Sequence, residues 1–308
     1  MIDYKKIIKN PATRMAILNA LSFIPDSLML KIQYKIKTGN RLSLSNPRRY
    51  TEKLQWYKLY YKDPLMIKCA DKYDVRKYVK SKGLGDILIP CYGIYDSVEK
   101  IEWSTFPKQF VIKDTLGGGG RSVKIVQDKD TENIEELKVV VERWIKEKNN
   151  IKSGGREWPY YSGRNHRIIV EKFINSDPAK GGLIDYKFLC FNGKVELIYV
   201  LADRVPGRGA GCGFFDLEFN QLPITESDEE PLRRKITKPK NFCEMIKVAE
   251  KLAEDFPCAR IDLYNDNENI MFGEITFYDS SGYMIFAPDS FDYELGSKFK
   301  LPKMKRKL

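Results

Sequence analysis

The sequence of 308 residues contains no apolar run of the length that a membrane-spanning helix requires, about 18 residues. Its N-terminal lysines are soon followed by residues that interrupt any signal-peptide core, namely Asn10, Pro11, Thr13 and Arg14. It also has no CxxC pair, and its six cysteines are scattered through apolar or strand-like stretches, at Cys69, Cys91, Cys190, Cys212, Cys243 and Cys258. We therefore expect a cytoplasmic protein with buried, free thiols.

Histidine is almost absent, because His166 is the only one. The sequence accordingly lacks the Ser-His or Cys-His constellation of an enzyme that works through a nucleophilic side chain. A general-base role for His166 is one hypothesis. Its position just before an apolar strand favours the other hypothesis, a structural or lid position.

Composition supports a large folded enzyme with an anionic partner. With 43% hydrophobic and 12% aromatic residues, the chain can build a core of two or three lobes. Its 53 Lys and Arg residues exceed its 42 Asp and Glu residues and give a net charge of +11. The partner could be a nucleotide, an acidic glycan, a nucleic acid or a lipid headgroup, and charge alone does not choose among them.

The N-terminal part of the chain is predicted to be helical. Up to about residue 45, apolar residues recur at near-helical spacing among lysines, with a second helix beginning at Pro25-Asp26-Ser27 and ending at Gly39-Asn40. This segment is either an amphipathic anchor for an anionic membrane or an extension packed on the main body, and we favour packing. A helical pattern continues from Pro47 to Lys82.

Strand patterns dominate the rest of the chain. They indicate an α+β protein with antiparallel hairpins, and helices are expected at about 131–148 and 241–255. The predicted strands span 87–89, 110–113, 123–126, 168–173, 186–191, 195–201, 259–264 and 270–277.

A glycine-rich loop lies between two of these strands. Phe110-Val-Ile-Lys113 precedes the loop, and four glycines follow: Gly117, Gly118, Gly119 and Gly120. Their backbone N–H groups could approach an anion closely, with Lys113 as a charge beside it. Arg121-Ser122 replaces the Lys-Ser/Thr of a Walker A loop, and Ser122 replaces the last glycine of a kinase loop. The loop alone predicts phosphate binding or a flexible hairpin tip about equally.

A second candidate site is the hairpin from Arg260 to Thr276. Alternation places Arg260 and Asp262 on one face of the first strand, and Glu274 and Thr276 on one face of the second. If Asp262 pairs with Glu274, Arg260 falls opposite Thr276. Carboxylates on rigid strands suit Mg²⁺, whereas the intervening turn lacks the glycine of an EF-hand. An ordinary surface hairpin is the alternative, although charges inside apolar strands are costly.

Two weaker signals complete the set. The strand ending in Glu171, and the one starting at Asp185, could hold adenine and ribose. Asp203-Arg204 ends a strand, and we expect the following segment 206–213 to be a mobile loop. That loop is either an acceptor-side clamp or an exposed connection.

Together these signals resemble the ATP-grasp superfamily, and most closely its teichuronopeptide-biosynthesis-like family from bacterial surface-polysaccharide loci. The resemblance runs from about Tyr50 to Pro302. It rests on a series of short motifs in a fixed order: Thr51-Glu-Lys-Leu-Gln-Trp56, Ala70-Asp-Lys-Tyr-Asp-Val-Arg76, Phe110-Val-Ile-Lys113, Val170-Glu171, Asp185-Tyr-Lys-Phe-Leu-Cys-Phe-Asn-Gly193, Asp203-Arg204, Arg260-Ile-Asp-Leu-Tyr264 and Phe272-Gly-Glu-Ile-Thr-Phe277.

The resemblance implies an ATP-grasp fold, in which two α+β lobes grip ATP, preceded by a helical extension. The implied divisions are 1–50 for the basic extension, 51–105 for an N-terminal subdomain, 106–170 for the lid and 171–308 for the core. Implied ATP contacts are Lys72, Lys113, the loop from Gly117 to Gly120, Glu171, Phe173 and Asp185. Implied Mg²⁺ ligands are Asp262, Glu274 and Thr276, and implied catalytic residues are Arg260, Arg204 and Lys187.

The resemblance also implies a reaction. We expect an ATP- and Mg²⁺-dependent ligase that activates a carboxylate as an acyl phosphate and joins it to an amine. Its partners would be ATP, an amino acid and a uronic-acid glycan, with peripheral contact to an anionic membrane as a further prediction. Because two like charges on neighbouring strands repel, we expect Asp262→Asn and Glu274→Gln to leave folding intact.

Two other classes of function stay open. A glycosyltransferase of the same pathways would need an Asp-x-Asp metal motif, and only Asp266-Asn267-Glu268, in a turn, comes near it. A nucleic-acid or membrane binder is suggested by the net charge and by a basic tail at Lys298, Lys300, Lys303, Lys305, Arg306 and Lys307. We do not expect nucleic acid as a partner, because a binder of this kind would leave the paired strand carboxylates unexplained.

Overall fold

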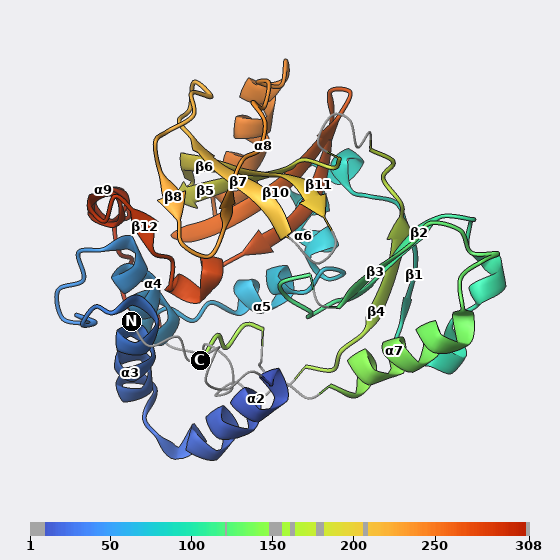
Figure 1. The fold of residues 1–308 in the computed structure, drawn as a ribbon, viewed down its shortest axis with the longest axis horizontal. Helices are drawn as coiled ribbons and strands as arrows, with labels where there is room; N and C mark the ends of the chain where they lie inside the picture. The colour runs from blue at the N-terminus through green and yellow to red at the C-terminus, as the bar shows by residue number, and fades with distance from the viewer. Residues whose placement is uncertain are drawn as a thin grey trace.

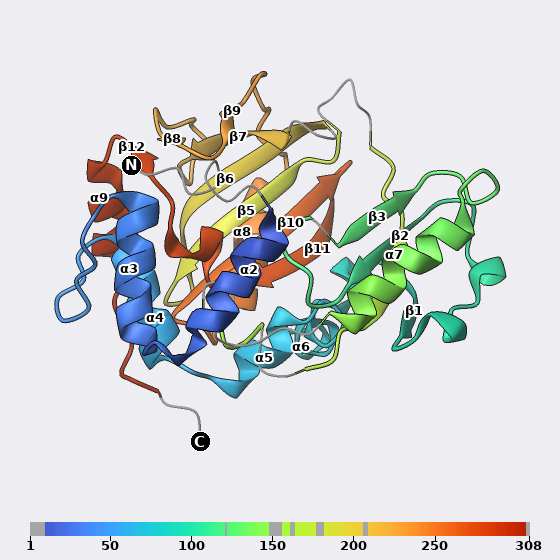
Figure 2. The same cartoon turned by 60° about the horizontal axis from the view of Figure 1, so that its bottom comes forward.

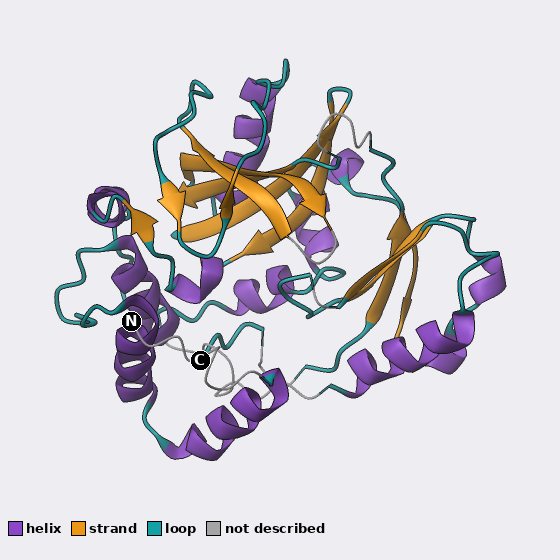
Figure 3. Cartoon of the chain, in the orientation of Figure 1, coloured by secondary structure: helices purple, strands orange, loops and turns teal. Residues whose placement is uncertain are grey.

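The computed structural model of the chain describes residues 10–120, 122–147, 156–160, 164–176, 182–205 and 209–305. Two separate β-sheets dominate it, and helices from the N-terminal part of the chain lie below and beside them in Figure 1. Most strand pairs are antiparallel, as Figure 3 helps to follow, so the predicted α+β class is confirmed.

The N-terminal part is helical, as predicted. Pro25 precedes the second main helix, and Gly39 ends it in the left-handed conformation at a φ of 77°. Residues 1–9 of the predicted extension lie outside the described residues. The elements are α2 (Pro11–Ala20), η1 (Leu21–Phe23), α3 (Asp26–Thr38), α4 (Tyr50–Tyr60), α5 (Pro64–Ala70), α6 (Val75–Ser81) and η2 (Gly85–Ile87).

The smaller sheet has four strands in the order β1-β4-β2-β3, all antiparallel. One side is covered by α7, which buries Leu137, Val141 and Trp144 in a core shared with Phe110 and Ile168. The bounds are β1 (Cys91–Tyr95), η3 (Val98–Lys100), η4 (Trp103–Thr105), β2 (Phe110–Asp114), β3 (Val123–Val126), α7 (Ile134–Lys146) and β4 (Ile168–Lys172).

The predicted strand at 87–89 is wrong. Residues 85–87 form η2, and Leu88 makes only an isolated bridge to Phe272. Pro90 follows, and because proline has no N–H to donate to a ladder, regular pairing starts after it at Cys91.

The larger sheet has six strands in the order β11-β10-β5-β6-β7-β9. One face packs on α8, where Phe188 meets Phe242 at a ring-centroid distance of 6.2 Å. Figure 2 shows this sheet beside the smaller one, with α5 and α6 between their lower ends. The bounds are β5 (Asp185–Phe191), β6 (Lys194–Val205), β7 (Gly209–Phe215), β9 (Glu230–Pro231), α8 (Phe242–Ala253), β10 (Cys258–Asp266) and β11 (Asn269–Thr276).

The segment predicted to be a mobile loop, 206–213, is mostly a strand. Residues 206–208 lie outside the described residues, but Gly209–Phe215 forms β7. A Cβ on Gly211 would come within 3.0 Å of the Leu232 backbone, and one on Gly213 within 2.3 Å of the Leu232 side chain. These glycines therefore allow close packing of Leu232 on the strand rather than mobility.

The chain's last segments pack on α4. Thr51 donates to Asp292 from its backbone N–H and its hydroxyl, at 3.0 and 2.7 Å. Gln55 donates to the Gly282 carbonyl at 2.7 Å, and Lys58 donates to the Ser281 carbonyl at 2.7 Å. Thr51, Gln55 and Lys58 thus tie α4 to two C-terminal elements, η6 (Asp279–Gly282) and α9 (Ser290–Lys298). Between these two in the chain lies β12 (Phe286–Ala287), which pairs with β8 (Thr225–Glu226).

The cysteines are all free, and Cys69, Cys190, Cys212 and Cys258 are buried as expected. The expectation of burial is wrong for Cys243, which is exposed on α8, and Cys91 is only half-buried. Within the described ranges, no helix combines the length and the apolar character needed to cross a bilayer.

Candidate active site

The hairpin of β10 and β11 has the predicted register. Asp262 pairs with Glu274, and Arg260 pairs with Thr276. A bulge follows Asp262, and Gly273 lies opposite it, where a Cβ would come 3.0 Å from the Asp262 carbonyl oxygen. The sequence therefore brings two carboxylates and a guanidinium together on one face of the hairpin.

Arg260 is the centre of this group. Its Nε and one Nη donate to the two oxygens of Asp262, at 2.6 and 2.7 Å, which is the two-point geometry of a strong ion pair. It also donates to Glu274 at 3.0 Å and to Asp279 at 2.5 Å. The guanidinium thus separates the carboxylates that were expected to repel each other.

Lys187 enters the group from the neighbouring strand. β5 pairs with β10 so that Lys187 lies opposite Asp262, and its ammonium forms an ion pair with that carboxylate. A second ion pair joins it to Asp185 at 2.7 Å. Both the lysine and the aspartates are buried, so each charge depends on its partners.

The pKa values of the two hairpin carboxylates shift in opposite directions from their ordinary values. Burial, reinforced by the nearby charges of Asp185 and Glu274, raises the pKa of Asp262 to about 6 against the effect of Arg260 and Lys187. Partial burial also opposes ionisation of Glu274, but Lys72, Arg260 and Lys187 outweigh it and lower the pKa of Glu274 to about 2. Glu274 is therefore the permanent negative charge of the pair, and its side chain is 39% exposed.

The donor set fits a hard divalent cation in chemistry and charge. In the described part of the chain, no three His, Cys, Asp or Glu side chains converge as a ready-made metal site. Four carboxylates nevertheless share two directly bonded cations, Lys187 and Arg260, which leaves two formal negative charges. Carboxylate oxygens are what Mg²⁺ takes from proteins when phosphates complete its shell. The roles of Asp262, Glu274 and Thr276 as ligands stay a prediction, and the Thr276 hydroxyl donates to Glu274 at 3.2 Å.

Lys72 connects the hairpin to the glycine loop. Its ammonium donates to the Gly117 carbonyl oxygen, and its charge lowers the pKa of Glu274. Its backbone N–H donates to the Thr115 carbonyl at 3.0 Å. Lys72 is therefore bonded to the glycine loop and acts on a hairpin carboxylate through its charge.

The loop joins β2 to β3 as predicted, and Gly118, Gly119 and Gly120 are exposed. Gly119 and Gly120 have φ values of 63° and 69°, which favour glycine. Lys113, at the end of β2, forms an ion pair with Glu171 of β4 at 2.8 Å. Phe173 directly follows β4 and is half-buried. The predicted contacts of these residues with ATP stay predictions.

Arg204 lies at the edge of the group. Its side chain is 62% exposed, and it approaches Asp185 at 4.0 Å. Asp203 beside it points elsewhere, to Arg234 at 2.6 Å. Of the predicted catalytic residues, Arg260 and Lys187 are therefore central, and Arg204 is peripheral.

His166 has the structural position that we favoured. It is buried, and its Nδ1 lies 2.7 Å from Asp114, whose other oxygen accepts from the Leu116 N–H at the base of the glycine loop. Nearby, Asp71 accepts from the Asp74 N–H at 2.9 Å and pairs with Arg167 at 3.0 Å. These contacts fix the chain on both sides of Lys72 and were not predicted from the sequence.

Asp279 and Tyr199 were not among the residues predicted from the sequence. Asp279 is buried, and it accepts from Arg260 and from the Tyr199 hydroxyl, the latter at 2.8 Å. Its only sequence signal is an acid that directly follows two aromatic residues at the end of a strand.

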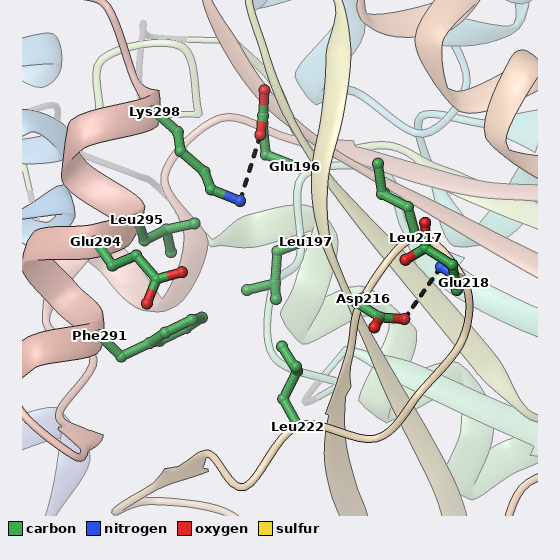
Figure 4. Close-up of a pocket in the computed structure, with 10 residues that line it drawn as sticks. All are labelled: Glu196, Leu197, Asp216, Leu217, Glu218, Leu222, Phe291, Glu294, Leu295 and Lys298. Carbon is green, nitrogen blue, oxygen red and sulfur yellow. Dashed lines mark hydrogen bonds and ion pairs between the residues drawn. The ribbon is translucent and has the colours of Figure 1, made fainter.

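A surface pocket lies apart from these residues, between α9 and the loop that follows β7. Figure 4 shows Leu197, Leu222, Phe291 and Leu295 in its wall. An ion pair at 3.6 Å joins Lys298 to Glu196 on one side of it (Figure 4). No predicted site residue lines this pocket.

A family model described as TupA-like ATPgrasp matches residues 52–300, and the chain belongs to this family. No curated protein sequence matches the chain.

Solved structures similar to the chain include ligases. D-alanine–D-alanine ligase from Bacillus anthracis is 20% identical at a TM-score of 0.42 and covers 68% of this chain and 57% of its own. The Helicobacter pylori enzyme is 15% identical, covers 80% of this chain and 67% of its own, and has a TM-score of 0.43. D-cycloserine synthetase is 15% identical and has a TM-score of 0.42, and the match covers 77% of this chain and 72% of the synthetase. The chain thus spans little more than half the length of the Bacillus enzyme.

Proposed function

We propose that the protein is a cytoplasmic, ATP- and Mg²⁺-dependent carboxylate–amine ligase of bacterial surface-polysaccharide synthesis. Its substrates would be an amino acid and a uronic acid of a capsule, O-antigen or teichuronic-type glycan. The observation that carries the proposal is the arrangement of Arg260 between Asp262 and Glu274, with Lys72 bonded to the glycine loop and its charge acting on Glu274. Membership of the TupA-like family supports it independently.

The charged side chains of this group could exchange their ion-pair partners when a nucleotide binds. Lys72 and Arg204 lie at its edge, and both could turn to the phosphates of ATP. Asp262 and Glu274 would hold Mg²⁺, which when bound neutralises charge on the phosphates. Arg260 would remain fixed by Asp279 while its bonds to the other two carboxylates loosen.

The proposed reaction has two steps. A carboxylate oxygen of one substrate attacks the γ-phosphorus of ATP, ADP leaves, and an acyl phosphate forms. The amine then attacks the acyl carbon, loses a proton, and expels phosphate. Arg260 would stabilise the oxyanion of that second step. No nucleophilic side chain is required, which agrees with the single buried histidine.

The test is ADP release, screened over amino acids and uronic-acid glycans offered in pairs. We expect release above the ATPase background only when both a carboxylate and an amine are present. A parallel melting curve should rise with Mg-ATP through mass action. A melting temperature that does not change with millimolar Mg-ATP but rises with a nucleotide sugar would favour the glycosyltransferase hypothesis.

A further inference from the structure

Exposed apolar side chains gather on the N-terminal helices. Among the described residues, Phe23 is 78% exposed, Leu28 is 50% exposed, and Ile17, Ile32 and Ile36 are each about 40% exposed. Single exposed apolar residues are ordinary on protein surfaces. Five within a stretch of 20 residues are a concentration that the fold does not require.

The helix α3 is apolar on two sides. One side buries Leu30 and Tyr34 in a small core with Tyr283. On the exposed side, Leu28, Ile32 and Ile36 follow one another at intervals of four residues, so they form one line along the helix. The buried side accounts for the packing of α3 on the body, and the exposed line needs another explanation.

Basic residues accompany this line. Lys31 and Lys35 are exposed and also four residues apart, so they run beside it. Residues 1–41 contain eight Lys and Arg residues and two Asp residues, a net charge of +6 within a chain total of +11. An apolar line flanked by lysines, whose stems can lie on lipid while their ammonium groups meet phosphates, is typical of interfacial helices.

The shape of the segment favours a flat partner. In Figure 1, α2 and α3 meet at a corner on the lower edge of the molecule, away from both sheets. They also precede residue 52, where the match to the family begins. A basic and apolar corner outside the segment that the family model matches complements an anionic surface.

We propose that α2, η1 and α3 bind the surface of an anionic lipid bilayer. Leu28, Ile32 and Ile36 enter the boundary between headgroups and acyl chains, and Lys31 and Lys35 meet lipid phosphates. This would bring the site close to lipid-linked material, but the inference does not depend on the ligase activity.

The experiment is co-sedimentation of the full chain with vesicles of phosphatidylcholine, alone or mixed with phosphatidylglycerol. We expect binding to the mixed vesicles at low salt that fades as salt rises. The triple variant Leu28→Gln, Ile32→Gln, Ile36→Gln should bind on the order of tenfold more weakly or worse. Lys31→Gln should lose roughly fivefold. The control Val139→Gln, at an exposed apolar position of α7, should bind like the wild type.

Three results would overturn the inference. The triple variant could bind the vesicles as well as the wild type, or the wild type could bind neutral and anionic vesicles equally. Alternatively, the wild type could be a dimer in solution that the triple variant no longer forms. The last would assign the line to contact between two copies of the chain. The melting temperature of the triple variant without ligand should match the wild type, and so should its shift with Mg-ATP. That measurement confirms that the variant is folded and keeps failure here distinct from failure of the proposed ligase function.

Discussion

Asp279 accepts hydrogen bonds from both Arg260 and the Tyr199 hydroxyl, at 2.5 and 2.8 Å. Arg260 itself donates to Tyr199 at 3.1 Å. The guanidinium therefore has an anchor that is separate from the two carboxylates predicted to bind the metal. Such an anchor lets Arg260 keep its place when Asp262 and Glu274 change partners.

Asp279→Asn should lower turnover about 10- to 100-fold, because it removes the charge that fixes Arg260. Tyr199→Phe should have a smaller effect, about threefold to tenfold, since it removes only a neutral hydrogen bond. As positioning residues, both should change kcat more than the KM for ATP. Steady-state kinetics on each variant measure this, with Tyr186→Phe on the opposite face of the sheet as the control. A pure rise in KM would mean that the anchor acts on substrate binding instead.

The glycine loop permits a matched pair of alanine substitutions. At Gly118 a Cβ would meet no atom within 4 Å, so Gly118→Ala should leave the stability of the ligand-free protein unchanged. It should still weaken Mg-ATP binding about tenfold if the backbone of the loop closely approaches phosphate. At Gly117 a Cβ would lie 2.7 Å from the Ser122 side chain, so Gly117→Ala should lower the melting temperature as well.

Calorimetric titration with Mg-ATP and melting curves separate the two effects. Gly85→Ala serves as the control, because its Cβ would make only an ordinary contact at 3.6 Å and it lies outside the loop. If Gly118→Ala binds Mg-ATP as tightly as the wild type, the loop is a hairpin tip that does not contact phosphate.

Glu226 should make stability depend on pH. Burial, followed by the charges of Asp228 and Glu229, raises the pKa of Glu226 from 4.5 to about 7. The folded state thus holds a proton that the unfolded state has lost between these values. The stabilisation is complete below about pH 4.5 and is lost as pH rises through 7.

Glu226→Gln removes this dependence. Relative to the variant, the wild type should lose about 1–2 kcal/mol of unfolding free energy between pH 5 and pH 8. Urea unfolding at both pH values measures the difference. Glu268→Gln, on the exposed turn of the β10–β11 hairpin, should follow the wild type at both. Parallel pH curves for wild type and Glu226→Gln would contradict the shifted titration.

Much of the hairpin could be predicted from sequence because alternation and a short turn determine register. Asp262 opposite Glu274 needed only the strand period and the position of the polar turn. The same reasoning could not place Lys187 against Asp262. That contact depends on which strand pairs with β10, and strand order is a property of the whole chain.

The failures have equally specific causes. Residues 209–213 were predicted to be part of a loop because glycine usually signals flexibility, whereas here two glycines make room for Leu232. Asp279 was missed because its role comes from its burial and its bond to Arg260, which no local pattern reveals. The division of the chain into four subdomains stays a prediction.

The structure changes the prediction for Asp262 and Glu274 themselves. The sequence suggested that their charges repel, so that removing one would leave folding intact. Arg260 instead bonds to both, and Lys187 bonds to Asp262. Asp262→Asn should therefore cost about 2–4 kcal/mol of stability, because it leaves buried cations without their partner. Glu274→Gln, at a half-exposed side chain, should cost less than about 1 kcal/mol.

The losses of activity in these variants should not follow their losses of stability. If both carboxylates bind Mg²⁺, each variant should lose ADP formation by orders of magnitude, since charge stabilisation of the transferring phosphoryl group is typically worth several kcal/mol. Arg260→Lys should be damaging too, because an ammonium cannot reproduce the planar fork that meets Asp262. Glu274→Gln is the decisive variant, as it keeps the fold while removing the charge. The measurement is ADP formation beside melting temperature, with Glu268→Gln on the same hairpin as the control. Near-normal turnover in folded Glu274→Gln would exclude the hairpin from catalysis, whereas loss of turnover at an unchanged melting temperature would place it there.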